Sequence, residues 1–518
     1  MQLTQALHRA LARQPQQVAT ICGGRRHTLA QVHDRVARLA GALQGMGVRA
    51  GDRVAILSAN SDRYVETYMA VPWAGAAINP VNTRWSAAEI AYSLDDCDSR
   101  VLLIDDPFLP LLAELRQRCR ALTTIVHVGD TPPDSSLGLL SYEALIADAA
   151  PVVDAGRGGS DLAGVFYTGG TTGFPKGVML SHDALCFNAL ALVAEGMARV
   201  GDRGLHAAPM FHIADVSLLN ALWVVGGTHV TLPAFTPLAM LQALERERIQ
   251  TTVMVPTMVQ AMVDHPQAAE HDLSALRSLA YGGSPISEAV LGRALKLMPQ
   301  VDFMQVYGMT ELAPTVSVLP PALHTGPNTA KLRSGGLPAL GVQVRIVGAE
   351  GEALPRGQVG EIVVRSPAVM LGYWNKPDET AQALKGGWMH TGDGGRMDDD
   401  GFLYVVDRVK DMIITGGENV YSVEVEQAVA QHPAVAACAV IGVPDAHWGE
   451  RVHAVVVLKA GEQAAAEGIR DHCKTLIGGY KCPRSVDFVP ALPMSGAGKV
   501  LKTTLRQPYW AGRERQVA

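Results

Sequence analysis

The chain has 518 residues, of which 48% are hydrophobic and 18% are charged. This length exceeds what a single hydrophobic core normally organises, so we expect two or more globular domains. The 50 acidic residues outnumber the 44 lysines and arginines and give a net charge of -6, which argues against a dedicated nucleic-acid-binding protein.

The seven cysteines are dispersed along the chain and form no CxxC pair. Such a set is typical of free thiols in a reducing compartment, and no zinc-binding pattern such as HExxH occurs. The sequence contains neither a signal-peptide core nor an apolar run that approaches the roughly 18 residues needed to span a bilayer. We therefore expect a cytoplasmic protein.

Short β-rich runs alternate with helical patterns in the first part of the chain. Residues 53–57 and 101–104 are apolar runs typical of buried strands. Thr28, a favoured N-cap residue, precedes apolar residues at helical spacing, and Ser61 and Ser86 are predicted to begin further helices. This alternation predicts an α/β sheet with helices on its faces.

Polar or glycine-rich loops follow predicted strands at three places. The first is the sequence YTGGTTGFPKG at residues 167–177, the second begins at Gly282 after residues 278–281, and the third begins at Gly308 after residues 303–307. Ligands of open α/β sheets bind beyond the carboxyl ends of the strands. We therefore expect these loops to contribute to one site.

The remaining sequence is richer in β-structure. From about residue 332, strand-like segments alternate with Gly, Pro and Asp turns. From about residue 411, a helical segment at 422–431 is followed by strand-like segments at 436–441 and 452–458. We therefore predict an α/β protein with a large N-terminal domain of α/β sheets plus a β-rich subdomain, and a small C-terminal α+β domain.

The loop at residues 167–177 has the composition of a phosphate-binding loop. Backbone N–H groups of glycines can converge on an anion, threonine hydroxyls add donors, and Lys176 adds a positive charge. The loop is not a Walker A loop, because Lys176 lies between Pro175 and Gly177 rather than before a serine or threonine. The alternative, a flexible surface loop, leaves this density of phosphate-compatible groups unexplained.

The same loop resembles the phosphate loop of the adenylate-forming superfamily, which includes acyl-CoA synthetases, peptide-synthetase adenylation domains and beetle luciferases. Further motifs match in the order of that superfamily and cover nearly the whole chain: YGMTE at 307–311, YW at 373–374, GWMHTGD at 387–393, DRVKD at 407–411, GGEN at 416–419 and SGAGK at 495–499. The resemblance implies an N-terminal domain at residues 1–409 that binds ATP and the acyl group. It also implies a mobile C-terminal domain at residues 410–518, with its hinge near Lys410.

The resemblance further implies how ATP and Mg²⁺ are bound. The residues implied for ATP are Thr168, Gly169, Gly170, Thr171, Thr172 and Lys176 at the β- and γ-phosphates, Gly283, Ser284, Pro285 and Tyr307 at the adenine, and Asp393 with Arg408 at the ribose. Thr310 would contact the α-phosphate, and Glu311 would ligate Mg²⁺, a hard cation that prefers oxygen. Without the surrounding motifs, Glu311 would be read as an exposed helix-cap acid and Asp393 as a turn residue.

Lys499 is implied to bridge the carboxylate of the acid and ATP while the acyl-adenylate forms. The C-terminal domain would then rotate about Lys410 and bring Gly416 and Gly417 to the site, where the thiol of CoA attacks the acyl carbonyl. The residues implied for catalysis are Lys499, Thr310, Glu311 and His212.

The acyl pocket is expected around His212, Trp223, Tyr281 and Gly282, which match blocks that line it in the superfamily. The alternative for His212 is a hydrogen-bonded core histidine. The nearby blocks hold no lysine or arginine placed to pair with a second carboxylate, and no aspartate where an α-ammonium group is bound. The pattern favours a fatty or aryl monocarboxylic acid.

An acyl-CoA synthetase that uses ATP, Mg²⁺ and coenzyme A is the leading hypothesis. Two alternatives stay open, a stand-alone adenylation enzyme that loads a carrier protein and a catalytically silent nucleotide-binding protein. The silent protein is disfavoured by the retained residues Lys176, Glu311, Asp393, Arg408 and Lys499. The resemblance is compatible with a homodimer, and we expect no nucleic-acid partner.

Overall fold

The computed structural model describes residues 1–132, 134–168, 175–284, 286–325, 329–408, 411–415, 418–445, 447–495 and 499–511, with the backbone alone at 329, 407, 408 and 419. The chain divides into two compact units. The large unit comprises Met1–Gln343 and Arg365–Met389, and the small unit comprises Val344–Val364 and His390–Ala518.

Two sheets form the framework of the large unit. Within the described residues, one sheet has eight strands in the order β19 (Gly372–Tyr373), β9 (Lys176–Ser181), β8 (Leu162–Thr168), β4 (Ala77–Pro80), β3 (Arg53–Leu57), β5 (Ser99–Ile104), β6 (Thr124–His127) and β7 (Leu140–Ser141). The other, again within the described residues, has nine in the order β16 (Leu337–Pro338), β15 (Thr315–Leu319), β14 (Asp302–Gly308), β13 (Ser278–Gly282), β12 (Thr251–Met254), β10 (Arg203–His206), β11 (Thr228–Thr231), β1 (Val18–Cys22) and β2 (Arg25–Thr28). The central strands of both sheets are parallel.

Helices α3 (Asp62–Trp73), α7 (His182–Ala194) and α8 (Ile213–Val225) pack against these sheets. Helix α3 contacts β4 of the eight-stranded sheet and also β1 and β11 of the nine-stranded sheet, so it lies between them. Every residue of α3 and nearly every residue of α8 is buried. The sequence of α8 is mostly apolar and shows little amphipathic pattern, as expected of a helix buried on all sides. Helix α3 instead buries Asp62, Arg63 and Glu66, which pair with Arg25, Glu143 and Arg35.

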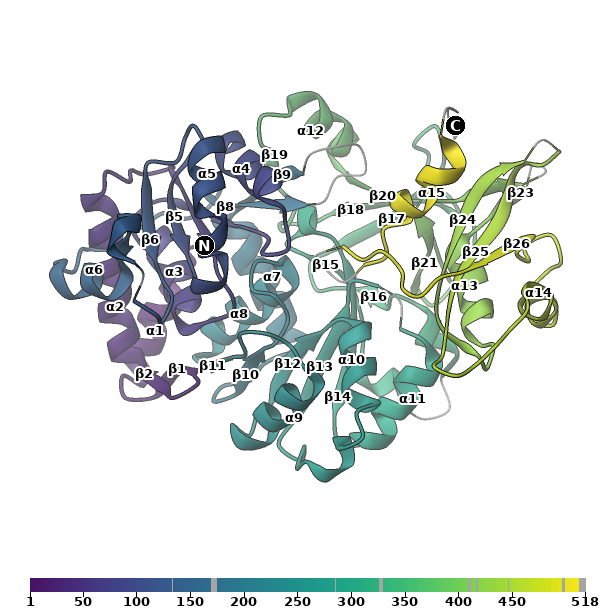
Figure 1. Ribbon diagram of the computed structural model, residues 1–518, viewed down its shortest axis with the longest axis horizontal. Coiled ribbons are helices and arrows are strands. Elements are labelled where there is room, and N and C mark those ends of the chain that lie inside the picture. The colour runs from purple at the N-terminus through teal and green to yellow at the C-terminus, as the bar shows by residue number, and fades with distance from the viewer. Residues whose placement is uncertain are drawn as a thin grey trace. The chain divides into compact units, whose positions relative to one another are not determined.

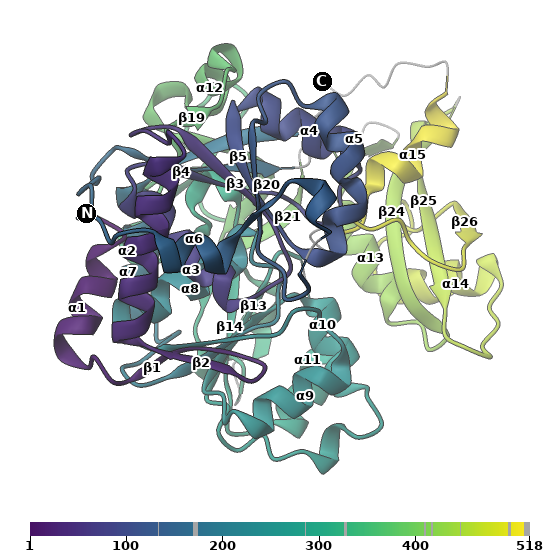
Figure 2. The same ribbon diagram turned by 60° about the vertical axis from the view of Figure 1, so that its left-hand side comes forward.

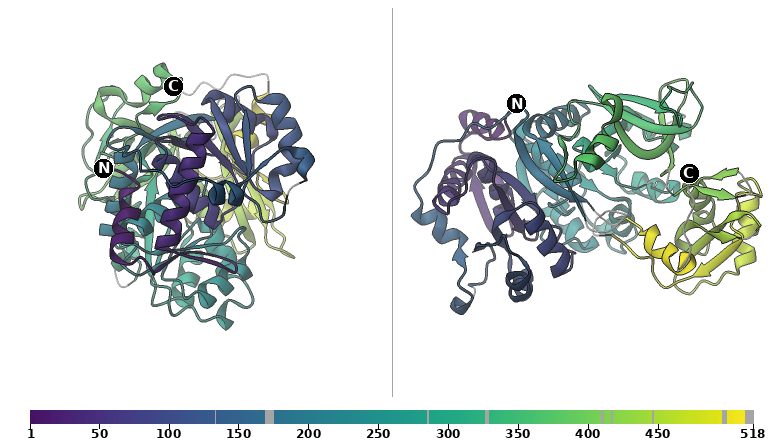
Figure 3. Two further views of the ribbon diagram at one scale, coloured as in Figure 1. Left: turned by 90° about the vertical axis from the view of Figure 1, so that its left-hand side faces the viewer. Right: turned by 90° about the horizontal axis from the view of Figure 1, so that it is seen from above.

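The outer faces of the two sheets carry amphipathic helices. Helices α4 (Ala87–Asp96) and α5 (Leu112–Arg118) bury apolar side chains against β3, β5 and β6. Helices α9 (Pro237–Arg246), α10 (Pro256–Val263) and α11 (Glu288–Leu297) pack on β12 to β14 (Figure 1). The large unit is completed by α1 (Gln5–Arg13), α2 (Leu29–Gly45), α6 (Tyr142–Asp148) and α12 (Pro377–Ala383), and Figure 3 shows the unit from two further directions.

The small unit is built on two further sheets. The strands of the first are β17 (Gln343–Val347), β18 (Gly360–Arg365), β20 (Met389–Met397) and β21 (Leu403–Arg408). Those of the second are β23 (Glu418–Val420), β22 (Ile413–Thr415), β25 (Gly449–Leu458) and β24 (Val435–Asp445), with β26 (Ser485–Phe488) paired to β25. Helices α13 (Ser422–Ala430), α14 (Ala466–Lys474) and α15 (Lys502–Trp510) accompany the second sheet (Figure 2).

The mixed α/β class predicted from the sequence is confirmed. The small unit contains residues 344–364 and 390–408 together with the C-terminal segment. The sequence analysis instead predicts that these residues belong to a β-rich part of the N-terminal domain. The functional boundary at residue 410 stays a prediction. No helix in the described ranges combines the length and apolarity that crossing a bilayer requires.

The predicted helix starts are confirmed in atomic detail. The Thr28 hydroxyl accepts a hydrogen bond from the backbone N–H of Gln31, and the Gln31 side chain accepts one from the backbone N–H of Thr28. Ser86 forms the same reciprocal capping box with Glu89, and Ser61 caps α3. These caps satisfy N–H groups that a helix leaves unpaired at its start.

His182 supplies a prediction about stability. It is the first residue of α7 and is fully buried, and burial lowers the pKa of its imidazole to about 4. Because this folded-state pKa lies below the unfolded value of about 6.5, the stabilisation is complete above pH 6.5 and is lost as the pH falls towards 4. We expect His182 to account for a loss of about 3 kcal/mol in the free energy of unfolding over that range.

Urea unfolding of the wild type and of His182→Gln at pH 7 and pH 4.5 measures this loss. The variant should show a shallower decline than the wild type, since glutamine does not titrate. Equal declines would mean that His182 is not protonated on unfolding.

Candidate active site

Two of the predicted glycine-rich loops leave neighbouring strands. Strands β13 and β14 are parallel partners, with Gly282 opposite Val306, so their carboxyl ends lie side by side. A Cβ atom at Gly282 would lie 2.3 Å from the Val306 carbonyl oxygen, and one at Gly308 would lie 1.7 Å from that of Pro314. Both glycines are therefore required by close backbone contact.

The third loop connects the antiparallel strands β8 and β9, which we call the phosphate hairpin. Thr168, the last residue of β8, is the cross-strand partner of Lys176, the first residue of β9. The two predicted phosphate ligands are therefore neighbours at the base of the hairpin. Gly169, Gly170, Thr171 and Thr172 lie outside the described residues.

Lys176 contacts two side chains from the segment that follows β19. Its ammonium group forms an ion pair with Glu379 of α12 and lies 5.3 Å from the centroid of the Tyr373 ring. Strand β19 brings Tyr373 there by pairing with β9, where Tyr373 is opposite Val178. The lysine is thus oriented by an anion and an aromatic face.

Glu311 belongs to a short 3₁₀ turn, Thr310–Leu312, that follows β14. The residue is only 7% exposed, and its Oε1 accepts a hydrogen bond of 2.8 Å from the Tyr373 hydroxyl. Burial, reinforced by the Glu311 carboxylate, raises the pKa of Tyr373 well above its ordinary value, so the phenol stays a donor. Tyr373 therefore connects Lys176 to Glu311.

This carboxylate fits a hard divalent cation. Mg²⁺ is usually held by one or two carboxylates together with substrate phosphates, and Glu311 offers an oxygen ligand fixed by Tyr373. The described part of the chain contains no group of three or more His, Cys, Asp and Glu residues that could hold a metal without phosphates.

The other residues predicted to bind ATP are those at the adenine and the ribose. Tyr307 lies in β14 opposite Ser317, Gly283 and Ser284 follow β13, and Pro285 lies outside the described residues. In the small unit, Asp393 of β20 is the cross-strand partner of Arg408 of β21, so the predicted ribose-binding pair are neighbours. The side chain of Arg408 lies outside the described residues.

Lys499 belongs to the small unit and contacts Ser495. Its backbone N–H donates to the Ser495 hydroxyl at 3.0 Å, and its carbonyl accepts from the Ser495 N–H at 2.6 Å. Lys410, Gly416 and Gly417, which the resemblance assigned to the hinge and to CoA, lie outside the described residues.

The residues predicted for the acyl pocket do not share one environment. His212 is the N-cap of α8, where its Nδ1 accepts a hydrogen bond of 3.2 Å from the Ala214 N–H. Trp223, on the same helix, is buried with its ring 4.4 Å from that of His229. Tyr281 is buried, with its hydroxyl 2.9 Å from Nε2 of His324. Their roles towards the acid stay predictions.

Two residues that contact the site, Tyr373 and Glu379, were not assigned roles from the sequence. Tyr373 belongs to the motif at residues 373–374, and this motif was the signal that could have found it. Glu379 is an ordinary acid in the first turn of a helix, so nothing in the sequence singled it out.

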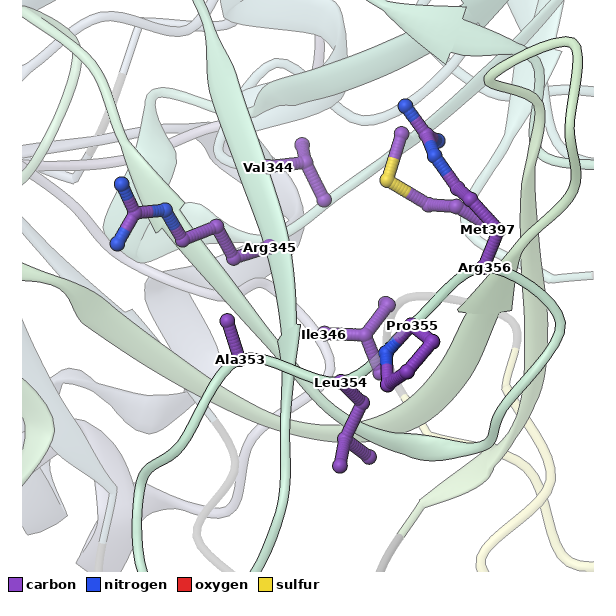
Figure 4. A pocket seen from close by; sticks show the side chains of 8 residues that line it. All are labelled: Val344, Arg345, Ile346, Ala353, Leu354, Pro355, Arg356 and Met397. Carbon is purple, nitrogen blue, oxygen red and sulfur yellow. The ribbon is translucent and has the colours of Figure 1, made fainter.

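A shallow pocket of about 190 Å³ lies in the small unit between β17 and the segment before β18. It is lined by Val344, Arg345, Ile346, Ala353, Leu354, Pro355, Arg356 and Met397. Its two guanidinium groups point in different directions rather than towards one point (Figure 4). None of the predicted site residues lines it.

Fold and site together define a nucleotide-binding α/β protein whose lysine and buried carboxylate are suited to phosphates and a metal ion. The family model described as "AMP-binding enzyme" matches residues 7–374, and the model of the "AMP-binding enzyme C-terminal domain" matches residues 424–499. The chain therefore belongs to the AMP-binding enzyme family.

Similar proteins are acid-activating ligases. The chain is 40% identical over 500 residues to a feruloyl-CoA synthase of Amycolatopsis sp, covering 96% of each sequence. It is 36% identical over 508 residues to the fatty acid–[acyl-carrier-protein] ligase ScoC of Streptomyces coeruleorubidus, covering 97% of this chain and 96% of ScoC. The crystal structure of the anthranilate CoA ligase AuaEII in complex with anthranoyl-AMP matches with a TM-score of 0.90 at 29% identity, covering 98% of this chain and 97% of AuaEII.

These matches confirm the predicted activity, which is ATP-dependent, AMP-forming ligation of a carboxylic acid to coenzyme A, with ATP, Mg²⁺ and coenzyme A as cofactors.

The Lys176–Glu379 ion pair gives a prediction for ATP binding. If Lys176 binds the phosphates of ATP, as the sequence predicts, phosphate must displace Glu379 from it. A partly exposed ion pair of this kind contributes about 0.2–1 kcal/mol. We therefore expect Glu379→Gln to lower the KM for ATP by about two- to fivefold, as measured by pyrophosphate release. Asp378→Asn, which changes the adjacent carboxylate of α12, should leave that KM unchanged. A raised KM in Glu379→Gln would contradict competition by Glu379.

Proposed function

We propose that the enzyme activates an aryl monocarboxylic acid of the hydroxycinnamate type and transfers it to coenzyme A. The observation that carries the reaction is the connected set Lys176, Tyr373 and Glu311, which joins a phosphate-compatible cation to a metal-compatible carboxylate. The substrate class is supported by the 40% identity to a feruloyl-CoA synthase across 96% of both chains.

In the first step, a carboxylate oxygen of the acid attacks the α-phosphorus of ATP. The new O–P bond forms as the bond to the pyrophosphate oxygen breaks, and pyrophosphate leaves with its electron pair. Thr168 and Lys176 bind the β- and γ-phosphates, and Thr310 binds the α-phosphate. Glu311 would hold Mg²⁺, which would neutralise phosphate charge. Lys499 contacts both anions and offsets their repulsion.

In the second step, the thiolate of coenzyme A attacks the acyl carbonyl of the adenylate. The C–S bond forms, the C–O bond to AMP breaks, and AMP leaves. We assign Lys410 to the hinge between the two steps, and Gly416 and Gly417 to the passage of the pantetheine arm.

The nucleoside part of ATP is bound by a separate set of residues in both steps. Asp393 and Arg408 bind the ribose, and the residues that bind the adenine are Gly283, Ser284, Pro285 and Tyr307.

The acid lies against His212, Gly282, Tyr281 and Trp223 in this proposal. His212 is supported by its place as the N-cap residue of α8, the helix that also carries Trp223. We also propose that the enzyme is cytoplasmic and forms a homodimer.

The test is pyrophosphate release with Mg-ATP, with and without coenzyme A, across acetate, long-chain fatty acids, benzoates, ferulate and other cinnamates. We expect coenzyme A to stimulate release most strongly with the cinnamates, and the thioester to be seen by mass spectrometry. A preference for long-chain fatty acids would overturn the proposed substrate class while leaving the ligase activity in place.

Loading of a carrier protein is the second candidate, and the 36% identity to ScoC favours it. It shares the first step and differs only in the thiol that accepts the acyl group. Acyl transfer to a phosphopantetheinylated carrier protein at a higher kcat/KM than to coenzyme A would establish it.

A further inference from the structure

Asp96, the last residue of α4, touches the neighbours of two proposed site residues. Its Oδ2 accepts a hydrogen bond of 2.6 Å from the hydroxyl of Tyr167, which directly precedes Thr168. Its backbone carbonyl accepts one of 2.8 Å from Nε1 of Trp374, which directly follows Tyr373. Asp96 thus connects the phosphate hairpin to the segment that fixes Glu311.

Trp374 is held from two further directions. Its backbone N–H donates to the carbonyl of Gly177 at 2.7 Å, so it also contacts the second strand of the hairpin. The Arg53 guanidinium carbon lies 4.7 Å from the centroid of its indole ring, which is the geometry of a cation–π contact. Arg53 Nε also donates to the backbone carbonyl of Cys97, next to Asp96.

The Tyr167 ring packs against Gly177, and its hydroxyl is held by Asp96. A Cβ atom at Gly177 would lie 3.0 Å from Cζ of Tyr167 and 2.7 Å from a methyl carbon of Val165, so the ring packs directly on the glycine backbone. Burial, with Cys97 and Asp96 close by, raises the pKa of Tyr167 far above its ordinary value. The phenol therefore remains a donor to Asp96 at every physiological pH.

We infer that Asp96 is a positioning residue for ATP: through Tyr167 and Trp374 it fixes the base of the phosphate hairpin relative to Tyr373 and Glu311. The inference rests on the proposed roles of Lys176 and Glu311. Asp96 acts through these aromatic residues, and its effect comes from geometry. Misplacement of reacting groups by about 1 Å can cost about 100-fold in rate, so an anchor at the base of the hairpin affects both binding and turnover.

The experiment compares Asp96→Ala, Tyr167→Phe and the double variant with the wild type. Each single change removes the same hydrogen bond, so we expect each to weaken Mg-ATP binding, measured by calorimetry without acid, by about tenfold. The double variant should bind ATP no more weakly than Asp96→Ala, because both changes act on one contact. The KM for the acid should stay within about twofold of the wild type.

Asp95→Ala is the matched control. Asp95 precedes Asp96 on α4, and its carboxylate accepts the backbone N–H groups of Arg120 and Ala121, both at 2.9 Å, away from the hairpin. It should lower the thermal midpoint without weakening ATP binding. If Asp95→Ala weakens ATP binding as much as Asp96→Ala, or if Tyr167→Phe leaves it unchanged, the inference is overturned.

A direct measurement of ATP binding also distinguishes a failure of this inference from a failure of the proposed function. Absence of turnover with every acid would count against the proposed substrate class. A tenfold weaker ATP affinity in Tyr167→Phe under the same conditions would still support positioning by Asp96.

Discussion

Replacing Lys499 by alanine is expected to lower the rate of adenylate formation by about 10²–10³ while ATP binding stays within a few-fold of the wild type. The acid carboxylate and the α-phosphate are both anionic, and the charge between them grows as the new bond forms. A fixed cation at that point stabilises the transition state more than the ground state, and removing one preorganised donor costs about 3–4 kcal/mol. Pyrophosphate release measures the rate, and calorimetry measures ATP affinity.

The second half-reaction supplies a sharp test of this role. Since Lys499 is assigned to adenylation alone, Lys499→Ala should still form the thioester from a chemically prepared acyl-adenylate and coenzyme A at a near wild-type rate. Lys474→Ala is the control, because Lys474 is an exposed lysine of the same unit that pairs with Asp471. Unchanged adenylation in Lys499→Ala, or equal loss of both half-reactions, would contradict the assignment.

Local features of the fold could be predicted because their causes are local. Thr28, Ser61 and Ser86 begin helices through contacts with residues three positions away. The parallel strands were visible as short apolar runs. In each case the information lies within a few neighbouring residues.

The contacts that organise the site join residues far apart in the sequence. Tyr373 and Glu311 are 62 positions apart, and Tyr167 and Asp96 are 71 apart. The Tyr373–Glu311 contact depends on β19 joining the edge of the eight-stranded sheet, and nothing in the two-residue strand predicts its partner. The motifs therefore identified the residue types but gave no geometry.

The grouping of the β-rich segments could not be read from the sequence for a related reason. Residues 365–389 belong to the large unit, whereas the segments on either side belong to the small unit. The chain thus enters the small unit, leaves it and returns. The sequence pattern predicts the individual strands. It does not predict which strands pair across residues 365–389, because that pairing is decided by packing.

Replacing Glu311 by glutamine is expected to lower kcat/KM for ATP by about 10²–10³ and to raise the Mg²⁺ concentration needed for half-maximal activity. Glutamine has nearly the same size as glutamate, so the buried site stays filled. It also keeps an oxygen that can accept a hydrogen bond from the Tyr373 hydroxyl. It removes the negative charge that a hard cation requires. Activity measured across a Mg²⁺ titration gives both quantities.

Two further variants decide whether the charge or the surroundings of Glu311 matter. Tyr373→Phe removes the hydroxyl that donates to Glu311, and loss of such an outer partner weakens metal sites by about 10- to 100-fold. We therefore expect an effect in the same direction but smaller than that of Glu311→Gln. Glu288→Gln, on the surface where Glu288 pairs with Arg333, should change neither quantity. An unaltered Mg²⁺ dependence in Glu311→Gln would exclude Glu311 as the metal ligand, and the Tyr373–Glu311 contact would then serve only to hold β19 against the turn after β14.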